Sequence, residues 1–410
     1  MKKRTILLAL LLCFACAMTA GVQAFAETSA DDDPSALVEQ ARALLDAGDY
    51  DAAVPLLQKA AELGNATGQR LLGNCYAAGT GVEQDDQEAV KYYRLAEAQG
   101  DILALYNLAM HCLEGAGVEQ DVEKAEAYLK SCAEQGDAES QYVLGYFYLY
   151  GEELPEDQEA AVQYLQMAAD QEHVQACFNL GICYDNGWGV AQDFAKAAEY
   201  YKLAADRGMD CAQYKLGCCY QFGIGVAQNY EKAFEYYVLA ADQGFPDAMT
   251  SLGYLYQYGL GTAQDYGQMV KYYTMAAERG EPMGQFNLAC CYRDGLGVEQ
   301  DYEAMLRYSR LAADQGNANA QFNLGYCYYL GVGVDQDYDE AFRLYKLAAD
   351  QGFPVAMFAF GDCYFLGNGT EKDLETAAQW YQKSLDAGYE PDETDREHLE
   401  IVLGKDYAAK

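Results

Sequence analysis

Residues 317–352 read NANAQFNLGYCYYLGVGVDQDYDEAFRLYKLAADQG, and this stretch decides the fold because the chain repeats its pattern. The step is a fixed 36 residues with no insertion, and nine units cover residues 65–388. A period between about 20 and 50 residues is typical of solenoids, in which each unit packs only on its neighbours. The first glycine of the central Gly-x-Gly recurs at Gly79, Gly115, Gly151, Gly187, Gly223, Gly259, Gly295, Gly331 and Gly367.

Each unit contains two short stretches with helical spacing of apolar residues, 320–330 and 341–349 in the quoted copy. Helices of about three turns are marginal alone, so each must bury its apolar stripe against a neighbour. Gly331 supplies a positive φ where the first helix ends, and Asp337 is suited to cap the second helix. Gly325 has no side chain and lets two helices approach closely. The sequence therefore predicts an all-α solenoid of antiparallel helix pairs.

The shared pattern, LGxCYxxGxGVxQDxxxAxxYYxxAAxxG, resembles the Sel-one-like repeat family, a relative of the tetratricopeptide repeats. The resemblance covers residues 65–388. It implies a right-handed superhelix of helix pairs that serves as a protein-binding scaffold.

The flanking segments differ from the repeats in composition. Residues 27–34 are short and acidic and are predicted to be a linker. Residues 35–64 resemble an ordinary tetratricopeptide repeat and should cap the array, because a terminal unit has one face without a neighbour. Residues 389–410 are expected to form a second capping helix and a tail.

Residues 1–26 have the features of an export signal. A basic start precedes an apolar run, and residues 24–26 are Ala-Phe-Ala, which suits a cleavage site after Ala26. Lipid attachment at Cys16 is a weaker alternative because Cys13 and Phe14 fit a lipoprotein signal poorly, and an uncleaved anchor is a further one. We expect a periplasmic or secreted protein whose mature chain has no membrane span.

One unit departs from the pattern. In residues 137–172, Glu153 stands where the second glycine of Gly-x-Gly belongs, Pro155 follows, and Glu172 replaces the closing glycine. Drift at a tolerant loop explains these changes. A local change in superhelix curvature and a partner contact are the alternatives.

The charge balance restricts the partners. The chain has 64 acidic and 27 basic residues and a formal net charge of −37. Such a surface repels phosphate backbones and anionic lipids, so nucleic acid and membranes are poor partners. It favours a basic protein or peptide, cations, or simple solvation of the outer faces. We expect a monomer.

The cysteines follow the repeat. Six occupy one column immediately before the tyrosine of the first helix, which indicates a buried, space-filling role. Equivalent positions in adjacent units should lie about 8–10 Å apart, which is too far for a disulfide. Free core thiols are therefore predicted, although disulfides are common in exported proteins. The column is Cys75, Cys183, Cys219, Cys291, Cys327 and Cys363.

No catalytic, metal or cofactor site is evident. His111, His173 and His398 are scattered and have no Cys or carboxylate at metal-ligand spacing. The Gly-x-Gly copies end helices rather than follow strands, so they are turns and not phosphate loops. We therefore expect no catalytic residue, no metal, no cofactor and no enzymatic activity.

The resemblance implies that the first helices line a concave groove. Three columns of the repeat would then lie on or near it: aromatic residues two before the Leu-Gly pair, the asparagines that follow them, and tyrosines two after the leucine. Aromatic rings give contact area at low entropic cost, and asparagine can pair with a partner's backbone. The alternative is that the aromatic column packs first helices together and that the asparagines bond helix to helix. The predicted groove residues are Tyr106, Tyr142, Phe178, Tyr214, Phe286, Phe322 and Phe358; Asn107, Asn179, Asn287 and Asn323; and Tyr146, Tyr254 and Tyr326.

Three functions are compatible with the sequence, and they are ranked here from the most to the least favoured. The first is a non-catalytic scaffold or adaptor that binds a protein or peptide in the groove. The second is a secreted hydrolase, acting on cell wall or through a thiol, which the abundant Cys and Tyr alone suggest. The third is an acidic, cation-binding envelope protein.

Overall fold

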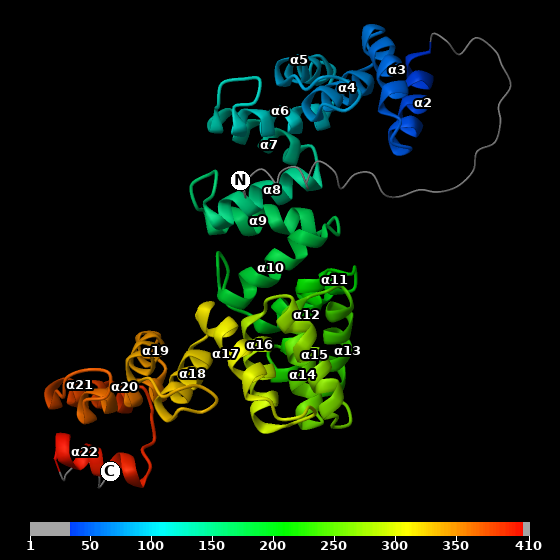
Figure 1. Ribbon diagram of the computed structural model, residues 1–410. Coiled ribbons are helices and arrows are strands. Elements are labelled where there is room, and N and C mark those ends of the chain that lie inside the picture. Colours follow the sequence, from blue (N-terminus) through cyan, green and yellow to red (C-terminus); the bar gives the residue numbers. More distant parts are fainter. Residues whose placement is uncertain (1–32, 405–410) are drawn as a thin grey trace. The chain divides into compact units, whose positions relative to one another are not determined.

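The computed structural model describes residues 33–404, and it is entirely helical over that range, with no strand (Figure 1). Within this range 21 helices follow one another as ten successive pairs and a final single helix. The first helices of the pairs are α2 (Pro34–Asp46), α4 (Ala66–Ala78), α6 (Ile102–Glu114), α8 (Ala138–Tyr150), α10 (Val174–Asn186), α12 (Asp210–Phe222), α14 (Pro246–Tyr258), α16 (Pro282–Asp294), α18 (Ala318–Leu330) and α20 (Pro354–Leu366). The second helices are α3 (Tyr50–Glu62), α5 (Asp86–Glu97), α7 (Val122–Glu134), α9 (Gln158–Ala169), α11 (Phe194–Ala205), α13 (Tyr230–Asp242), α15 (Tyr266–Glu278), α17 (Tyr302–Asp314), α19 (Tyr338–Asp350) and α21 (Leu374–Asp386), and α22 (Glu393–Leu403) ends the series.

The chain forms two compact units that divide after Asp193. The first contains α2 to α10 and the second α11 to α22. Inside each unit a first helix packs on the second helix of its own pair, and that helix packs on the next first helix. The predicted all-α repeat solenoid is confirmed.

The helix ends follow the predicted chemistry. Asp337 caps α19 by accepting a hydrogen bond of 3.0 Å from the backbone N–H of Glu340. Gly331 ends α18 in the left-handed region, with φ of 74°. A side chain there would be strained, so this position of the repeat calls for glycine.

The two helices of a pair approach closely because glycine faces a large side chain. At Gly73 an added Cβ would lie 2.6 Å from Cε1 of the buried Tyr93 ring. At Gly253 the added atom would overlap the ring of Tyr273 in the same way. Where the first helix carries Ala109 instead, the facing residue is the smaller Leu129. Glycine also faces a leucine in one unit, at Gly145 and Leu165, so the larger first-helix residue occurs opposite a smaller side chain but the reverse is not required.

Buried glutamines tie successive pairs together. The side-chain amide of Gln285 in α16 donates to the carbonyl of Ala277 in α15, at 3.3 Å. Its Oε1 accepts from Nε2 of Gln315, which follows α17, at 2.9 Å. One side chain thus links three helices and satisfies a carbonyl near a helix end. The same bridge is made by Gln69, Gln141, Gln213 and Gln321.

The irregular unit keeps its helix pair and changes its loop. Glu172 retains the left-handed conformation of the glycine that it replaces, with φ of 64°, and no other non-glycine residue among 33–404 has a positive φ. In the loop, Leu154 is buried. Glu153 does not adopt the positive φ seen at Gly117 and Gly189, which hold the same position in other units. Leu154 takes the place of a valine such as Val118, which also packs on the core, so the loop differs mainly in the backbone at Glu153.

The last helix seals the end of the second unit. Asp392 caps α22 through a capping box. Leu399, within α22, is buried. Nδ1 of His398 lies 2.8 Å from Oδ1 of Asp362 in α20, and the hydroxyl of Tyr381 donates to the same oxygen at 2.6 Å. The pKa of His398 is raised, chiefly by this hydrogen bond to Asp362.

Residues 33–404 contain no helix that is both long enough and apolar enough to span a bilayer. The predicted export signal, residues 1–26, lies outside the described residues, as does the linker up to residue 32.

The matched columns predict the result of a double-mutant cycle. Gly253→Ala should lower the free energy of unfolding by about 1–3 kcal/mol because the added methyl overlaps Tyr273. Tyr273→Leu in the same chain should recover part of that loss, since the pair then reproduces Ala109 and Leu129. Denaturant unfolding of both single variants and the double variant measures the coupling. Strictly additive losses would contradict the size matching.

The His398 contact predicts a pH dependence for the end of the array. Because folding raises the pKa of His398, its stabilisation is fully present below the unfolded value of about 6.5 and is lost as pH rises through the folded value. The stability difference between the wild type and His398→Gln should therefore be larger near about pH 5.5 than near about pH 8.5. Thermal unfolding at both pH values measures it. A difference that grows with pH would show that the neutral ring makes the contact.

Candidate functional site

The first helices form one continuous face within each unit. In the second unit α14 contacts α16 directly, and this contact is more extensive than any between second helices of the described residues. At α14 and α16 the first helices therefore lie closer together than any two second helices, so at this point they are on the inner side of the local curve. We call the face that the first helices form the first-helix face.

The predicted groove residues fall into three groups. Tyr254 and Tyr326 are well exposed, at 42% and 51%. A second group is half-buried and reaches the surface in part. Its members are Tyr106, Tyr142, Tyr146, Phe178, Tyr214, Phe286, Asn287, Phe322 and Asn323.

Three predicted groove residues are buried, and the prediction of an exposed role for them is wrong. Asn107 is 7% exposed, and its Nδ2 donates to Oδ1 of Asn74 at 2.9 Å. Asn179 is 6% exposed. Phe358 is 2% exposed because its ring packs between Tyr381 and Tyr389. For Asn107, helix-to-helix bonding was the correct alternative.

The aromatic column before the leucine also packs between first helices. The ring of Tyr214 in α12 lies 5.1 Å from that of Phe245, which caps α14. Phe322 in α18 lies 5.8 Å from Phe353, which caps α20. These rings therefore serve the scaffold first and offer only an edge to solvent.

Open cavities lie along the first-helix face of the second unit. One of about 300 Å³ lies between α16, α17 and α18 and brings together the predicted residues Phe286, Asn323 and Tyr326. We call it the Ser309 cavity; Ala289, Cys290, Arg293, Met305, Ser309 and Cys327 complete its lining. A second of about 300 Å³ lies beside it and brings Tyr254 and Asn287 to Cys290 and Arg293. Another of about 210 Å³ contains Phe322, Tyr326 and Phe358.

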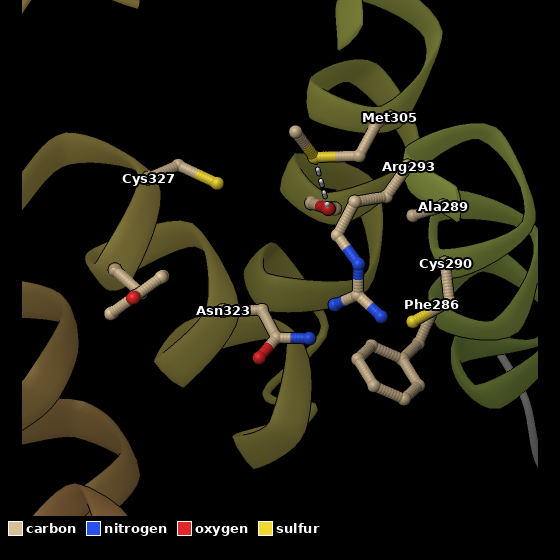
Figure 2. A pocket seen from close by; sticks show the side chains of 9 residues that line it. Phe286, Ala289, Cys290, Arg293, Met305, Asn323 and Cys327 are labelled. Carbon is tan, nitrogen blue, oxygen red and sulfur yellow. Dashed lines mark hydrogen bonds between the residues drawn. The ribbon is translucent and has the colours of Figure 1, made fainter. Parts of the chain in front are cut away.

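Figure 2 shows the Ser309 cavity from close by, with Arg293, Asn323 and Phe286 directed toward it. Asp294 holds Arg293 in a bidentate ion pair, with Nε 2.8 Å and Nη2 2.9 Å from the carboxylate oxygens. This hydrogen-bonded pair raises the pKa of Arg293, which stays charged. It orients a cation at the mouth of an otherwise neutral cavity.

The first unit has its own cavity on the first-helix face, of about 510 Å³. It brings the predicted residues Tyr106 and Asn107 to Arg70, which forms an ion pair of 3.0 Å with Asp101. The mixed charges of its lining give it no strong preference for either sign. Further lining residues are Arg42, Leu45, Asp46, Leu71, Asn74, Leu103, Asp137 and Glu139.

The sequence analysis missed Arg293, Ser309 and Met305. A signal was present, because Tyr308-Ser309 stands where other units have a tyrosine pair such as Tyr272-Tyr273. The unit in which serine interrupts this tyrosine pair is the one that contains the Ser309 cavity.

The cysteine column is buried as predicted. Cys75, Cys183, Cys291, Cys327 and Cys363 are buried free thiols. Burial raises the pKa of Cys183, Cys291 and Cys363 to about 12, so these thiols are protonated at neutral pH. A protonated thiol is a poor nucleophile, and the column gives no support to a thiol enzyme.

The histidines have structural contacts. His173 caps α10 and lies 3.1 Å from a carboxylate oxygen of Glu139, and His111 bonds the carbonyl of Ala116 at 2.9 Å. Within residues 33–404 no group of three or more His, Cys, Asp or Glu side chains could hold a metal ion.

Comparisons with known proteins agree with this architecture. A family model of the Sel1 repeat matches residues 45–65, 66–101, 102–137, 138–173, 174–209, 212–245, 246–281, 282–317, 318–353 and 354–389. No curated protein sequence matches the chain.

Two solved structures resemble it over most of their length. A protective antigen of uropathogenic Escherichia coli strains that displays an SLR fold is 28% identical, covers 93% of this chain and 92% of its own, and gives a TM-score of 0.64. A Sel1 repeat protein from Oxalobacter formigenes is 28% identical, covers 77% of this chain and 94% of its own, and gives a TM-score of 0.63.

The adjacent thiols of Cys290 and Cys291 can show which side of α16 is accessible to a reagent in solution. Cys290 lines two cavities, whereas Cys291 is buried with a pKa of about 12. N-Ethylmaleimide should therefore modify Cys290 well before Cys291 in the folded protein. Peptide mass mapping during the reaction measures both rates on one helix. Equal rates, or faster modification of Cys291, would show that the opposite side of α16 is accessible.

Proposed function

The chain belongs to the Sel1 repeat family, and on that premise we propose that it is a non-catalytic scaffold that binds a protein or peptide along its first-helix face. The single observation that carries the proposal is the series of open cavities between exposed aromatic rings on α14 and α18. Sel1 and tetratricopeptide-like solenoids are typical of protein-interaction scaffolds.

The contact surface offers anchors suited to a peptide. The exposed ring of Tyr254 lies 4.7 Å from that of Tyr258, so the two form one aromatic platform on α14. Tyr326 provides a second exposed ring on α18 and lines one of the two cavities beside Cys290. Aromatic residues beside pockets are the usual energetic centres of protein interfaces. The strong negative charge of the chain favours a basic partner and speeds its approach.

The other functions have less support. A hydrolase needs a reactive nucleophile, and burial keeps the pKa of the column thiols high. The acidic residues of the helix starts are N-caps bonded to backbone amides, as at Asp265 and Asp301. Such carboxylates are engaged in the fold, which weakens the case for a cation-binding envelope protein.

We also propose the remaining organisation from sequence. An export signal of residues 1–26 would be removed after Ala26, and the monomeric mature protein would be periplasmic or secreted. The similar protein from uropathogenic Escherichia coli is a protective antigen, which fits exposure outside the cytoplasm. Residues 35–64 and 389–410 would cap nine repeats over 65–388.

A peptide selection tests the proposed face. Random peptides displayed on phage should yield binders to the mature protein, and those binders should bind at least about ten-fold more weakly to Tyr254→Ala/Tyr326→Ala. The control is Tyr266→Ala/Tyr302→Ala, which removes two rings of similar exposure, 39% and 40%, from second helices. Binding that survives the first change and is lost with the second would place the site on the other face.

A further inference from the structure

The repeat has one interior position that a tyrosine ring normally fills from the second helix. In the two preceding units Tyr237 and Tyr273 hold it, and both are buried against a glycine of the first helix. Their hydroxyls reach the first-helix face. Tyr237 donates to Oε1 of Gln221 at 2.6 Å, and Tyr273 donates to Oε1 of Gln257 at 3.0 Å. Each ring therefore spans the unit and ends on a hydrogen-bond acceptor.

In the unit 282–317 this ring is missing. Ser309 stands in place of the tyrosine, and Ala289 in place of the glycine. The single methyl group of Ala289 does not replace a phenol ring. The hydroxyl of Ser309 finds only the sulfur of Met305, at 3.7 Å. The Ser309 cavity, of about 300 Å³, is the space that remains.

The rest of this unit is regular, so the cavity belongs to an ordered fold. The glutamine bridge through Gln285 is intact on both sides. The rings of Tyr292 and Tyr308 stack with centroids 6.0 Å apart, as the equivalent pair Tyr256 and Tyr272 does at 5.7 Å. One side chain is absent from an otherwise normal repeat.

The mouth of the cavity carries a cation. Arg293 lies four residues after the small residue, at a variable position that is Gln257 in the preceding unit and Tyr329 in the following one. No other unit has a cationic side chain there, and Arg293 is the sole charged residue lining the cavity. Asp294 bonds Nε and Nη2, which leaves the N–H groups of Nη1 for a ligand.

We propose that the Ser309 cavity binds a carboxylate carried on a phenyl-sized apolar group. The apolar group enters from the first-helix face into the space between Phe286, Ala289 and Met305, and the carboxylate stays at the mouth on Arg293. Asn323 and Tyr326 can add hydrogen bonds there. Size permits this, since a cavity of about 150 Å³ already admits benzene.

This inference goes beyond the proposed scaffold function, because the ligand need not be a protein. The same chemistry occurs in a free aryl carboxylic acid and in the C-terminal residue of a peptide that ends in phenylalanine. Guanidinium groups bind carboxylates in either setting through paired hydrogen bonds.

Calorimetric titration of the mature protein tests the site with 3-phenylpropanoate and its neutral analogue, 3-phenylpropanamide. The acid should bind, and the amide should bind at least about ten-fold more weakly, because it lacks the charge-assisted hydrogen bonds. Arg293→Gln restores the sister residue and should abolish the preference for the acid. Ala289→Gly/Ser309→Tyr restores the sister pair, refills the cavity and should abolish binding of both compounds.

The outcomes separate the parts of the proposal. Absence of binding by either compound, equal binding of acid and amide, or unchanged binding after refilling would each overturn it. Thermal unfolding checks that the variants fold. If the refilled variant does not fold, Arg293→Gln alone tests whether the site recognises the carboxylate. N-Acetyl-Ala-Ala-Phe assigns the source: tighter binding than 3-phenylpropanoate indicates a peptide C-terminus, and similar binding indicates a small acid. If none of these ligands binds, the peptide selection still tests the proposed function at Tyr254, which lies outside the cavity.

Discussion

The close approach of a bare backbone to a tyrosine ring is the constraint on which the repeat depends. At Gly217, Gly253, Gly325 and Gly361 any side chain would overlap the facing ring. The contact sets the distance between the helices of a pair, and each ring buries a large apolar area. The hydroxyls of Tyr237, Tyr273 and Tyr381 each donate to a side chain of the first helix. Because core packing is dense, a methyl group on the first helix requires a smaller facing side chain, as the pair Ala109 and Leu129 illustrates. The glutamine bridges then set the spacing between successive helix pairs. Each bridge needs a carbonyl near a helix end on one side and a second glutamine on the other.

Periodicity made most of this architecture predictable. The 36-residue step fixes the two helices, the glycine that ends the first and the aspartate that caps the second, since these depend on local backbone chemistry within one unit. The structure places α18 and α19 where the apolar spacing indicated, with Gly331 and Asp337 in the expected roles. The buried cysteine column could be predicted for the same reason.

Exposure on the first-helix face was harder to predict, because it depends on residues in the neighbouring unit. Asn107 is buried by its bond to Asn74, one unit earlier, whereas Asn287 in the same column is only half-buried. Phe358 is covered by Tyr389, which belongs to the C-terminal segment rather than to a following repeat. A column of like residues shares a backbone position but not a set of neighbours, so membership of a column does not determine burial.

The informative position is therefore Ser309, which differs from the tyrosine that most units have there. Replacing a buried aromatic side chain by a small residue costs about 3–5 kcal/mol in a typical core, because the surrounding structure closes the void only in part. A solenoid can carry such a loss in one unit, since stability is nearly a sum of local terms and the bridges at Gln285 and Gln315 hold the neighbours in place. The void also opens on the face where Arg293 lies, and Arg293 is the sole charged residue of its lining. A site for an apolar acid requires both a void that admits the apolar group and a cation at its mouth.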